Sequence, residues 1–531
     1  MYREERASRP EDESRNRRWL KFIPVEGWRC VRTQIAYPPE TDLSSWDQVA
    51  LEGIYGTLLV TVMWSNNYGV TYLILGHFGI HARKPERGLA MNIVTGAVTR
   101  RQVLQGFAAM LADAAIIVNA RAADTSAQNT ADGEAKNRAP ESTQMDKNND
   151  VAYGETTLPS GIRSRFVSNV NGLTMHILEA GFEESGRPCV LLLHGFPELA
   201  YSWRKQMLPL ARAGYHVVAP DQRGYGLTTG WDSNYDGDVA SFRLFNLTKD
   251  ALALVQVLGY RSVAAVVGHD FGSPVAAYSS LIRPDVFRSV ALMSAPFGGP
   301  PALPFNTANE TPASSAAARV NPQELAALPR PRKHYQWYYS TREANENLRN
   351  PPQGIHDFLR AYYHYKSADS KHKTQPFRLK SWDATELAKL PPYYVMDLDK
   401  GMAETVAPEM PSADEIAACK WLTEEELAVY IAQCSKNGFQ GGLQWYRCLT
   451  DPKYTADLQM FSGRTIDVPS CFIGGASDWG VYQAPGRFEK MQSTVCTRML
   501  GVHLVKGAGH FVQQEQFEET NRLLLEFLRQ V

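Results

Sequence analysis

Gly268-His269-Asp270-Phe271-Gly272 is the stretch of sequence that decides the predicted fold. It follows the apolar run 263–267, which is typical of a buried strand, and precedes a helical stretch over 273–282. The two glycines permit a tight turn from strand to helix, whose central side chain projects outward while the next backbone N–H points the same way. A carboxylate, Asp270, stands at that centre. The pattern predicts a catalytic turn, and a helix cap is the plainer interpretation if nothing else in the chain fits.

Short apolar or β-branched runs alternate with helical stretches on both sides of this turn. Residues 189–193 and 216–219 have the composition of buried strands, and 167–178 that of a hairpin around Asn171-Gly172. Buried strands separated by helices indicate a mostly parallel sheet, so we expect the α/β class. Ligands of such sheets bind at the carboxyl ends of the strands. The residues directly after each run are therefore the candidates for chemistry.

Three segments at or near strand ends join the turn in one pattern. They are His194-Gly195-Phe196-Pro197-Glu198, residues 221–226 and Gly507-Ala508-Gly509-His510-Phe511. The first is similar to an HGxP loop, the second to a DxRGxG segment and the third to a histidine loop. Together they resemble α/β-hydrolases with an aspartate nucleophile, namely the epoxide hydrolases and the haloalkane and haloacetate dehalogenases. The resemblance covers roughly residues 161–531, and it implies the α/β-hydrolase fold with a helical lid inserted in the core.

The order of residues along the chain fits a catalytic triad. Asp270, Asp478 and His510 follow one another as nucleophile, acid and histidine, which is the order that α/β-hydrolases require. Some relatives place the acid after the strand that follows the nucleophile helix. Here the run 290–293 is followed by Ser-Ala-Pro, so that Asp478 is left as the acid.

Phe271 contributes a backbone N–H to the predicted oxyanion hole, and its side chain helps to predict the kind of substrate. The resemblance makes the backbone N–H groups of Phe196 and Phe271 an oxyanion hole. A carboxylate nucleophile suits displacement at a saturated carbon whose leaving group is assisted. Dehalogenases of these families commonly use a tryptophan after the nucleophile to hold halide, or a nearby arginine to hold a carboxylate, whereas Phe271 has no side-chain donor. An epoxide instead needs an acid near its oxygen, which a phenol supplies at neutral pH.

The region 298–461 shows no strand periodicity and is expected to be a helical lid. Helical stretches are predicted at 342–348, 356–365 and 423–434. Segments 334–339 and 438–447 resemble the YQ-containing and WYR-containing segments of epoxide hydrolase lids. That resemblance makes Tyr335 and Tyr446 the two phenol donors. The alternative for both tyrosines is ordinary packing, which is the usual role of aromatic side chains.

The resemblance implies a two-step hydrolysis of an epoxide to a vicinal diol. Asp270 would attack an epoxide carbon to form an alkyl ester while Tyr335 and Tyr446 stabilise the alkoxide. Water activated by His510, which Asp478 orients, would then hydrolyse the ester. The partners would be a small apolar epoxide and water, and neither a cofactor nor a metal is implied.

Two other functions stay open at this point. The first is a haloalkane or haloacetate dehalogenase built on the same nucleophile. The second is a non-catalytic, ligand-binding α/β-hydrolase-fold protein, in which Asp270 and His510 would lie too far apart to work together. Neither the natural substrate and its stereochemistry nor the oligomeric state follows from the sequence, so a homo-oligomer also stays open.

The amino-acid composition of the chain excludes some classes of binding partner and of metal or disulfide structure. The chain has 531 residues, with 55 Lys and Arg against 56 Asp and Glu, so it has no basic field that would attract nucleic acid. A hydrophobic fraction of 44% is enough for a real core. The seven cysteines are scattered without metal-ligand spacing, so we expect neither a disulfide scaffold nor a zinc site.

The chain is expected to divide into four regions. These are an N-terminal region of unknown role (1–118), a flexible linker (119–160), a hydrolase core in two parts (161–297 and 462–531) and the lid (298–461).

Two segments of the N-terminal region bear on localisation. The uncharged run 53–76 is long enough for a membrane helix, but its polar centre favours two short strands. Residues 91–123 resemble an export signal with twin arginines, whereas Asp113 and the internal position favour an amphipathic helix. If the signal were real, Met91 would be the true start. We expect a cytoplasmic protein, and an exported one only if 91–123 acts as a signal.

Overall fold

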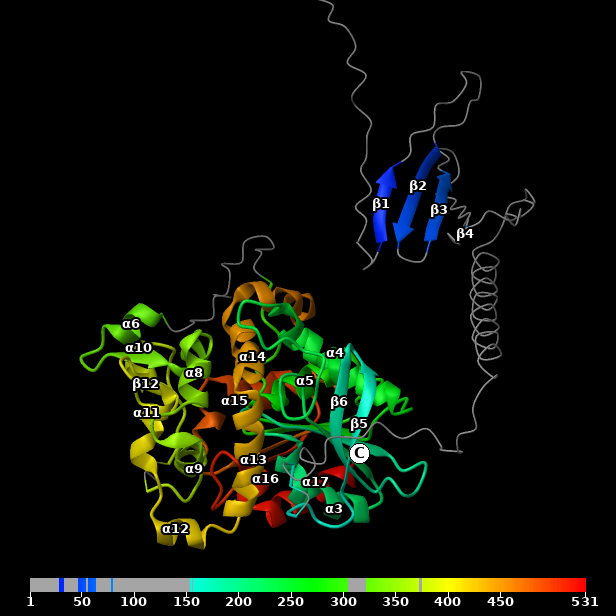
Figure 1. Cartoon of the computed structure of the whole chain (residues 1–531). Helices are drawn as coiled ribbons and strands as arrows, with labels where there is room; N and C mark the ends of the chain where they lie inside the picture. The colour runs from blue at the N-terminus through cyan, green and yellow to red at the C-terminus, as the bar shows by residue number, and fades with distance from the viewer. Residues whose placement is uncertain are drawn as a thin grey trace, which may run out of the picture. The chain divides into compact units, whose positions relative to one another are not determined.

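The computed structural model describes residues 153–154, 156–303, 321–371 and 375–531, together with the backbone of four strands nearer the N-terminus (Figure 1). The chain divides into two compact units, residues 1–137 and 138–531. All seven predicted site residues belong to the second unit.

The first unit contains a four-stranded antiparallel sheet. Its strands are β1 (Trp28–Arg32), β2 (Trp46–Gly53), β3 (Gly56–Met63) and β4 (Phe78–Gly79), paired in that order. Strand β3 lies within the uncharged run 53–76, so that this part of the run is a strand, as the polar centre favoured. In the part of the chain that the structure describes, no helix has the length and apolarity needed to cross a membrane. The segment 91–123 and residues 119–152 of the expected linker lie outside the described residues.

The second unit is built on an eight-stranded sheet with the order β14-β13-β10-β9-β7-β8-β6-β5. Strands β5 and β6 are antiparallel to their neighbours, and the other six run parallel. The bounds are β5 (Arg163–Val170), β6 (Leu173–Ala180), β7 (Cys189–Leu193), β8 (His216–Pro220), β9 (Ala265–His269), β10 (Val290–Met293), β13 (Ser470–Gly475) and β14 (Met499–Val505). The predicted α/β-hydrolase fold is thereby confirmed.

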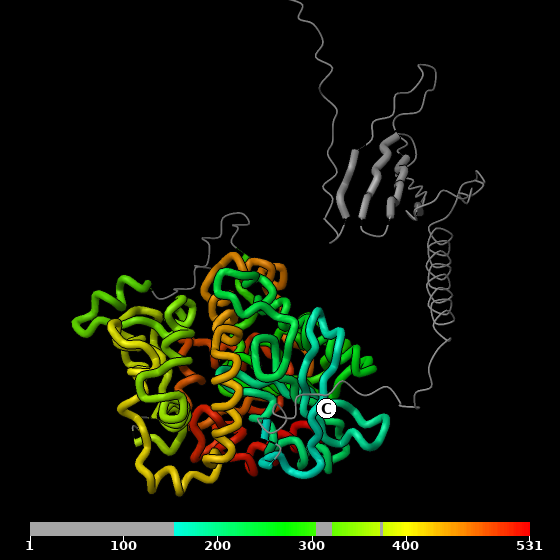
Figure 2. The backbone as a smooth tube through the Cα atoms, viewed as in Figure 1, coloured from blue at the N-terminus to red at the C-terminus, as the bar shows by residue number. Residues whose placement is uncertain are grey.

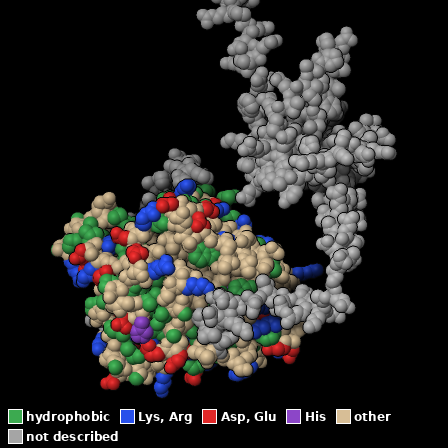
Figure 3. Space-filling model, in the orientation of Figure 1, with side chains coloured by type: hydrophobic (Ala, Val, Ile, Leu, Met, Phe, Trp, Pro, Cys, Tyr) green, Lys and Arg blue, Asp and Glu red, His purple; other side chains and the backbone are tan. Residues whose placement is uncertain are grey.

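Helices cover both faces of this sheet. Helix α3 (Arg204–Arg212) packs against α17 (Phe517–Leu528), and α4 (Leu244–Val257) packs against α5 (Gly272–Ile282) (Figure 1). Every residue of β7, β8 and β9 is buried, which requires cover on both sides and explains why these strands are continuous apolar runs. On the face of the molecule in Figure 3, acidic and basic side chains are interspersed, in keeping with the net charge of −1.

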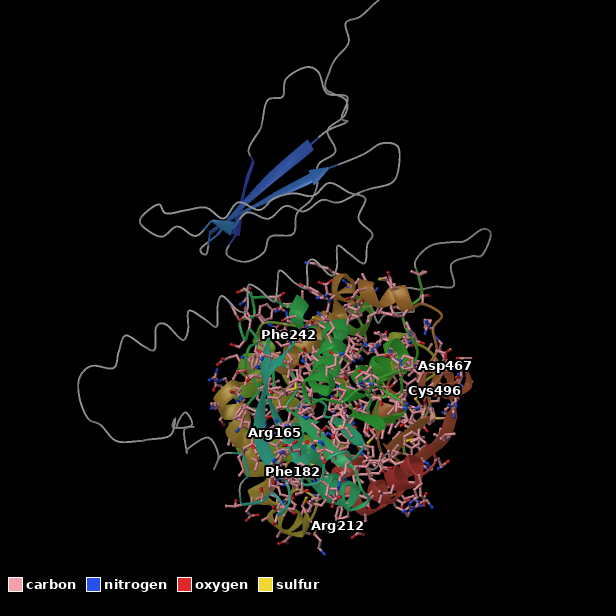
Figure 4. The ribbon with its side chains drawn as sticks, turned by 90° about the vertical axis from the view of Figure 1, so that its right-hand side faces the viewer. Arg165, Phe182, Arg212, Phe242, Asp467 and Cys496 are labelled. Atoms are coloured by element: carbon pink, nitrogen blue, oxygen red, sulfur yellow. The ribbon has the colours of Figure 1, made fainter. Side chains whose placement is uncertain are left out.

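The antiparallel hairpin β5–β6 forms one edge of the sheet, and a buried carboxylate on β6 connects it to β8. Glu179 on β6 accepts hydrogen bonds from Arg163 at 2.5 Å and from Arg165, and it lies 3.0 Å from His216. Figure 4 shows Arg165 and, just beyond β6, Phe182 on this side of the unit. Burial raises the pKa of Glu179, but the bonds from His216 and the two arginines outweigh it and hold that pKa at about 2.

The lid inserted between β10 and β13 is mostly helical (Figure 2). The three predicted helices are present as α8 (Glu343–Arg349), α9 (Gly354–Lys366) and α13 (Glu424–Asn437). The further helices are α6 (Pro322–Ala326), α7 (Tyr335–Tyr339), α10 (Ala384–Leu387), α11 (Met402–Val406), α12 (Ala413–Ala418) and α14 (Gln440–Thr450).

The helical region 298–461 also contains a short two-stranded sheet. Strands β11 (Arg332–His334) and β12 (Val395–Asp397) pair antiparallel within it. Strands of three residues are too short to show an alternating pattern, and these two are joined across a long stretch of sequence, so no local signal marks them.

The packed core begins earlier than the sequence predicted. Tyr153 is only 3% exposed, and its hydroxyl donates a hydrogen bond to the buried carboxylate of Asp221. The hydroxyl of Tyr201 donates to Thr157. The predicted flexible linker, which extended to residue 160, is therefore too long at this end.

We predict that a fragment starting at residue 151 is more stable than one starting at residue 158. The shorter fragment loses both the burial of the Tyr153 ring and a hydrogen bond to a buried carboxylate, so its free energy of unfolding should fall by at least about 2 kcal/mol. Urea unfolding of the two fragments measures the difference, and Tyr153→Phe in the longer fragment isolates the hydrogen bond. Equal unfolding midpoints would show that Tyr153 does not stabilise the core.

Candidate active site

The turn between β9 and α5 places Asp270 in a strained backbone conformation, with φ of +49°. Its N–H donates to the carbonyl of Met293 at 3.1 Å. A Cβ atom on Gly268 would lie 2.1 Å from the carbonyl oxygen of Gly272, and one on Gly272 would lie 2.2 Å from that of Leu193. Only glycine fits both positions, because no side chain tolerates such close backbone. The two glycines of the motif thus let the turn press against the neighbouring strand ends.

The structure brings Asp270, Asp478 and His510 together. His510 Nε2 lies 3.3 Å from Asp270 Oδ2, and His510 Nδ1 lies 3.1 Å from Asp478 Oδ1. The N–H of Gly480 donates to Asp478 Oδ1 at 2.7 Å. The non-catalytic alternative required Asp270 and His510 to lie far apart, and these distances contradict that requirement.

Each member of this trio alters the charge state of the others. Burial raises the pKa of Asp270, but His510, Lys366 and His269 outweigh it and hold that pKa well below its ordinary value. Burial and then Lys366 lower the pKa of His510, whereas Asp478 and Asp270 raise it, and the net shift is upward. Asp270 is thus a carboxylate at neutral pH, which is the form that a nucleophile needs.

One of the two proposed oxyanion donors already contacts Asp270. The N–H of Phe196 donates to Asp270 Oδ1 at 3.0 Å. Phe271 stands immediately before α5, so its backbone lies at the N-terminus of that helix. Oδ1 and Oδ2 of Asp270 therefore have different neighbours, the first a backbone donor and the second the histidine.

A second buried network supports the histidine from behind. His269 Nδ1 lies 2.6 Å from Glu198, and His269 Nε2 lies 2.7 Å from the backbone oxygen of His510. The other Glu198 oxygen accepts hydrogen bonds from Gln513 and Gln514, both at 2.9 Å. Glu198 and His269 belong to two separate sequence motifs, and nothing in their spacing shows that they meet.

Of the two predicted lid tyrosines, Tyr446 contacts the turn that carries Asp270, and Tyr335 contacts Tyr446. The ring of Tyr446 is 5.2 Å from that of Phe271 and 5.4 Å from that of Phe196, and Tyr335 lies 5.9 Å from Tyr446. The hydroxyl of Tyr335 donates to Gln483 at 3.2 Å, a partner for which the sequence held no signal. Burial and the charge of Asp270 raise the pKa of both phenols, so both keep their protons at neutral pH.

Neither Phe271 nor the indole of Trp445 offers a halide a free side-chain N–H donor. Phe271 packs edge to face on Trp445, whose indole N–H already donates to the carbonyl of Arg223 at 2.9 Å.

Among the described residues no group of three His, Cys, Asp or Glu side chains has the geometry to hold a metal ion.

Comparisons with known proteins identify relatives of this chain. The family described as alpha/beta hydrolase fold matches residues 188–369. Epoxide hydrolase B of Mycobacterium tuberculosis is 32% identical over 372 residues, which cover 68% of this chain and 97% of that protein. Epoxide hydrolase 3 of Siraitia grosvenorii is 31% identical, with 68% and 96% covered.

Solved structures give the same result. An epoxide hydrolase from an endophytic Streptomyces superposes with a TM-score of 0.55 at 29% identity, covering 70% of this chain and 96% of that one. Epoxide hydrolase A from Mycobacterium thermoresistibile superposes with a TM-score of 0.53 at 30% identity, covering 69% and 98%. With the fold and with relatives matched over nearly their whole length, the chain belongs to the epoxide hydrolase family of the α/β-hydrolase superfamily.

Proposed function

We propose that this chain hydrolyses an apolar epoxide to a vicinal diol through a covalent ester on Asp270. The observation that carries the proposal is the position of His510 between two carboxylates, 3.3 Å from Asp270 and 3.1 Å from Asp478. A histidine in this position is oriented by one carboxylate and reaches the carbon that the other presents to water. The aromatic rings of Phe196, Phe271 and Tyr446 around the turn favour an apolar substrate.

In the first half-reaction Asp270 attacks an epoxide carbon from the side opposite the breaking C–O bond. Oδ1 is held by the N–H of Phe196, so Oδ2 is the attacking oxygen. The epoxide oxygen takes the electron pair of the broken bond and accepts a proton from Tyr335 or Tyr446. Both phenols are protonated and buried near Asp270, as acid assistance to this oxygen requires.

In the second half-reaction His510 removes a proton from water, and the hydroxide attacks the carbonyl carbon of the ester. The oxyanion forms on Asp270 Oδ1, where the N–H groups of Phe196 and Phe271 stabilise it. The bond between the carbonyl carbon and the ester oxygen then breaks, and the diol oxygen takes the proton from His510. The remaining proton of the water restores the phenol, and Asp270 keeps one oxygen from water.

We assign residues 161–297 and 462–531, together with the packed segment that begins at Tyr153, to the catalytic core, and residues 298–461 to a lid that supplies the phenols. Tyr335 on α7 and Tyr446 on α14 are both lid residues; the ring of Tyr446 packs on Phe271 of the turn, and the ring of Tyr335 packs on Tyr446. The lid therefore supplies the acid, and the core supplies the nucleophile and the base.

The two half-reactions should separate in single variants. His510→Gln removes the base but leaves Asp270 able to attack, so a covalent adduct should accumulate and increase the protein mass by the mass of the epoxide. Asp270→Ala should give no adduct. Mass spectrometry of intact protein after incubation with a turned-over epoxide measures both. A His510→Gln protein that stays unmodified contradicts the covalent mechanism.

Asp478→Asn should slow hydrolysis of the ester far more than its formation. The amide no longer holds His510 in the tautomer that accepts a proton from water, and the loss in a comparable triad is on the order of 10⁴-fold. Single-turnover kinetics with quenched samples resolve the two phases. Asp467→Asn, at an exposed carboxylate that accepts hydrogen bonds from Thr465 and Thr497, is the control. Equal slowing of both phases would show that Asp478 does not act through the histidine.

Single replacement of Tyr335 or Tyr446 by Phe should reduce ester formation without abolishing it, because one donor remains. The double variant should lose nearly all of it, since removal of a transition-state donor costs on the order of 10²-fold or more. Single-turnover ester formation measures the effect, with thermal melting as the check on folding.

Retention of near-parental alkylation by the double variant would show that these phenols are not the acids. Release of halide from chlorinated substrates by that variant would then favour dehalogenation, which needs neither phenol.

A further inference from the structure

Lys366, the last residue of α9, is a buried cation beside the proposed triad. It is 5% exposed, and its ammonium lies over aromatic rings rather than against a carboxylate. The distances to the ring centres are 5.2 Å for Tyr362, 5.3 Å for Tyr394, 5.8 Å for Tyr393 and 5.9 Å for Phe511. Within the described ranges its side chain forms no ion pair, and its one hydrogen bond, to the hydroxyl of Tyr362, is 3.5 Å long.

This arrangement is costly unless the charge has a use. A buried ammonium without a counter-ion loses its hydration, and cation–π contacts in a dry site recover part of that loss. Burial lowers the pKa of the Lys366 ammonium, whereas the charges of Asp270, Asp478 and Glu198 raise it, and the rings stabilise the charged form without forming an ion pair with it. A carboxylate partner would instead cancel the electric field of the ammonium at its neighbours.

The backbone fixes Lys366 against the histidine loop. The N–H of His510 donates to the carbonyl of Lys366 at 2.9 Å, and a Cβ on Gly509 would lie 2.5 Å from that same oxygen. Glu515 accepts hydrogen bonds from the N–H of Ala368 at 2.8 Å and from that of Gly509 at 2.7 Å. The end of α9 and the histidine loop are therefore held together as one piece.

Charged groups meet His510 from several elements. They are Asp270 from the turn before α5, Asp478 from the loop after β13, Lys366 from α9, and the Glu198–His269 pair behind the loop. With Asp270 and Asp478 both ionised, the imidazolium form of His510 is favoured, and an imidazolium cannot take a proton from water. Once Asp270 is an ester its charge is gone, and the opposed charges of Asp478 and Lys366 remain.

We propose that Lys366 is a positioning residue for the hydrolytic half-reaction, whose caged ammonium offsets the carboxylates around His510 and keeps that histidine a neutral base. The proposal rests on the proposed function, because it assigns Lys366 a part in the step in which His510 activates water. The directions of the shifts agree with it: burial and then Lys366 lower the pKa of His510, against Asp478 and Asp270.

The test is the pH dependence of ester hydrolysis in Lys366→Met, which keeps the length of the side chain and removes its charge. Loss of the cation raises the pKa of His510, so the acidic limb of the hydrolysis rate should move to higher pH by about one unit. Well above both limbs the rate should approach that of the parent. Single-turnover hydrolysis across pH, after rapid ester formation, measures the limb directly.

Two matched variants separate charge from packing. Lys366→Arg keeps the charge and should keep the limb near its parental position. Lys333→Met removes a lid lysine that also lies over a tyrosine ring, 4.5 Å from that of Tyr338, but whose charged neighbours are Glu343, Asp399 and Glu404; its limb should not move. Lys366→Gln replaces the Met variant if thermal melting shows that the latter does not fold.

The proposal is overturned if the acidic limb of the hydrolysis rate keeps its parental pH in a folded Lys366 variant without the charge. It is also overturned if the Met and Arg variants lose the same fraction of the rate at every pH. Failure of the proposed function has a different signature. If His510→Gln forms no ester on Asp270, the mechanism itself fails. If the ester forms and the limb of the Lys366 variant stays in place, only the inference about Lys366 fails.

Discussion

In the proposed active site, two carboxylates must share a buried histidine without holding it permanently protonated. Asp270, Asp478 and His510 follow β9, β13 and β14, and these strands lie close together in the sheet order β14-β13-β10-β9. Parallel strands bring their carboxyl ends to one edge, so residues far apart in sequence meet there. The strained turn positions Asp270, and the N–H of Phe196 holds one of its oxygens. The buried Glu198–His269 pair supports the backbone of His510. The lid adds the phenols above it and, on our proposal, the cation beside it.

The parts of the site that the sequence predicted are those with a local signature. Asp270 is flanked by glycines that the backbone cannot replace, and His510 lies in a glycine-rich loop after an apolar run. Asp478 could be inferred because no carboxylate follows β10. The buried parallel strands could be predicted because strands in a sheet that is covered on both faces are continuous apolar runs. Membership of the epoxide hydrolase family, expected from motif resemblance, is confirmed by relatives matched over nearly their full length.

The missed features depend on contacts between distant residues. Strands β11 and β12 pair across about sixty residues of lid, and their three-residue length hides any alternation. Glu198 and His269 are far apart in the chain and meet only through the fold. Lys366 ends an ordinary amphipathic helix, and nothing in its neighbours along the sequence distinguishes it from an exposed lysine. Tyr153 lies in a polar stretch whose composition indicates a linker, although its ring is buried. In each case tertiary packing decided the environment, and composition alone did not.

In the covalent mechanism, the first turnover transfers an oxygen from water to the carboxylate of Asp270, and the new oxygen of the diol comes from Asp270. An isotope-labelling experiment distinguishes this from direct attack of water on the epoxide. The enzyme, in excess over a turned-over epoxide, completes a single turnover in heavy-oxygen water, after which the diol and the peptide that contains Asp270 are weighed by mass spectrometry. The account predicts heavy oxygen in the Asp270 peptide and none in the diol, because the new diol oxygen comes from the original carboxylate. Heavy oxygen in the first-turnover diol, with an unlabelled Asp270 peptide, would show that water attacks the epoxide directly and would contradict the account.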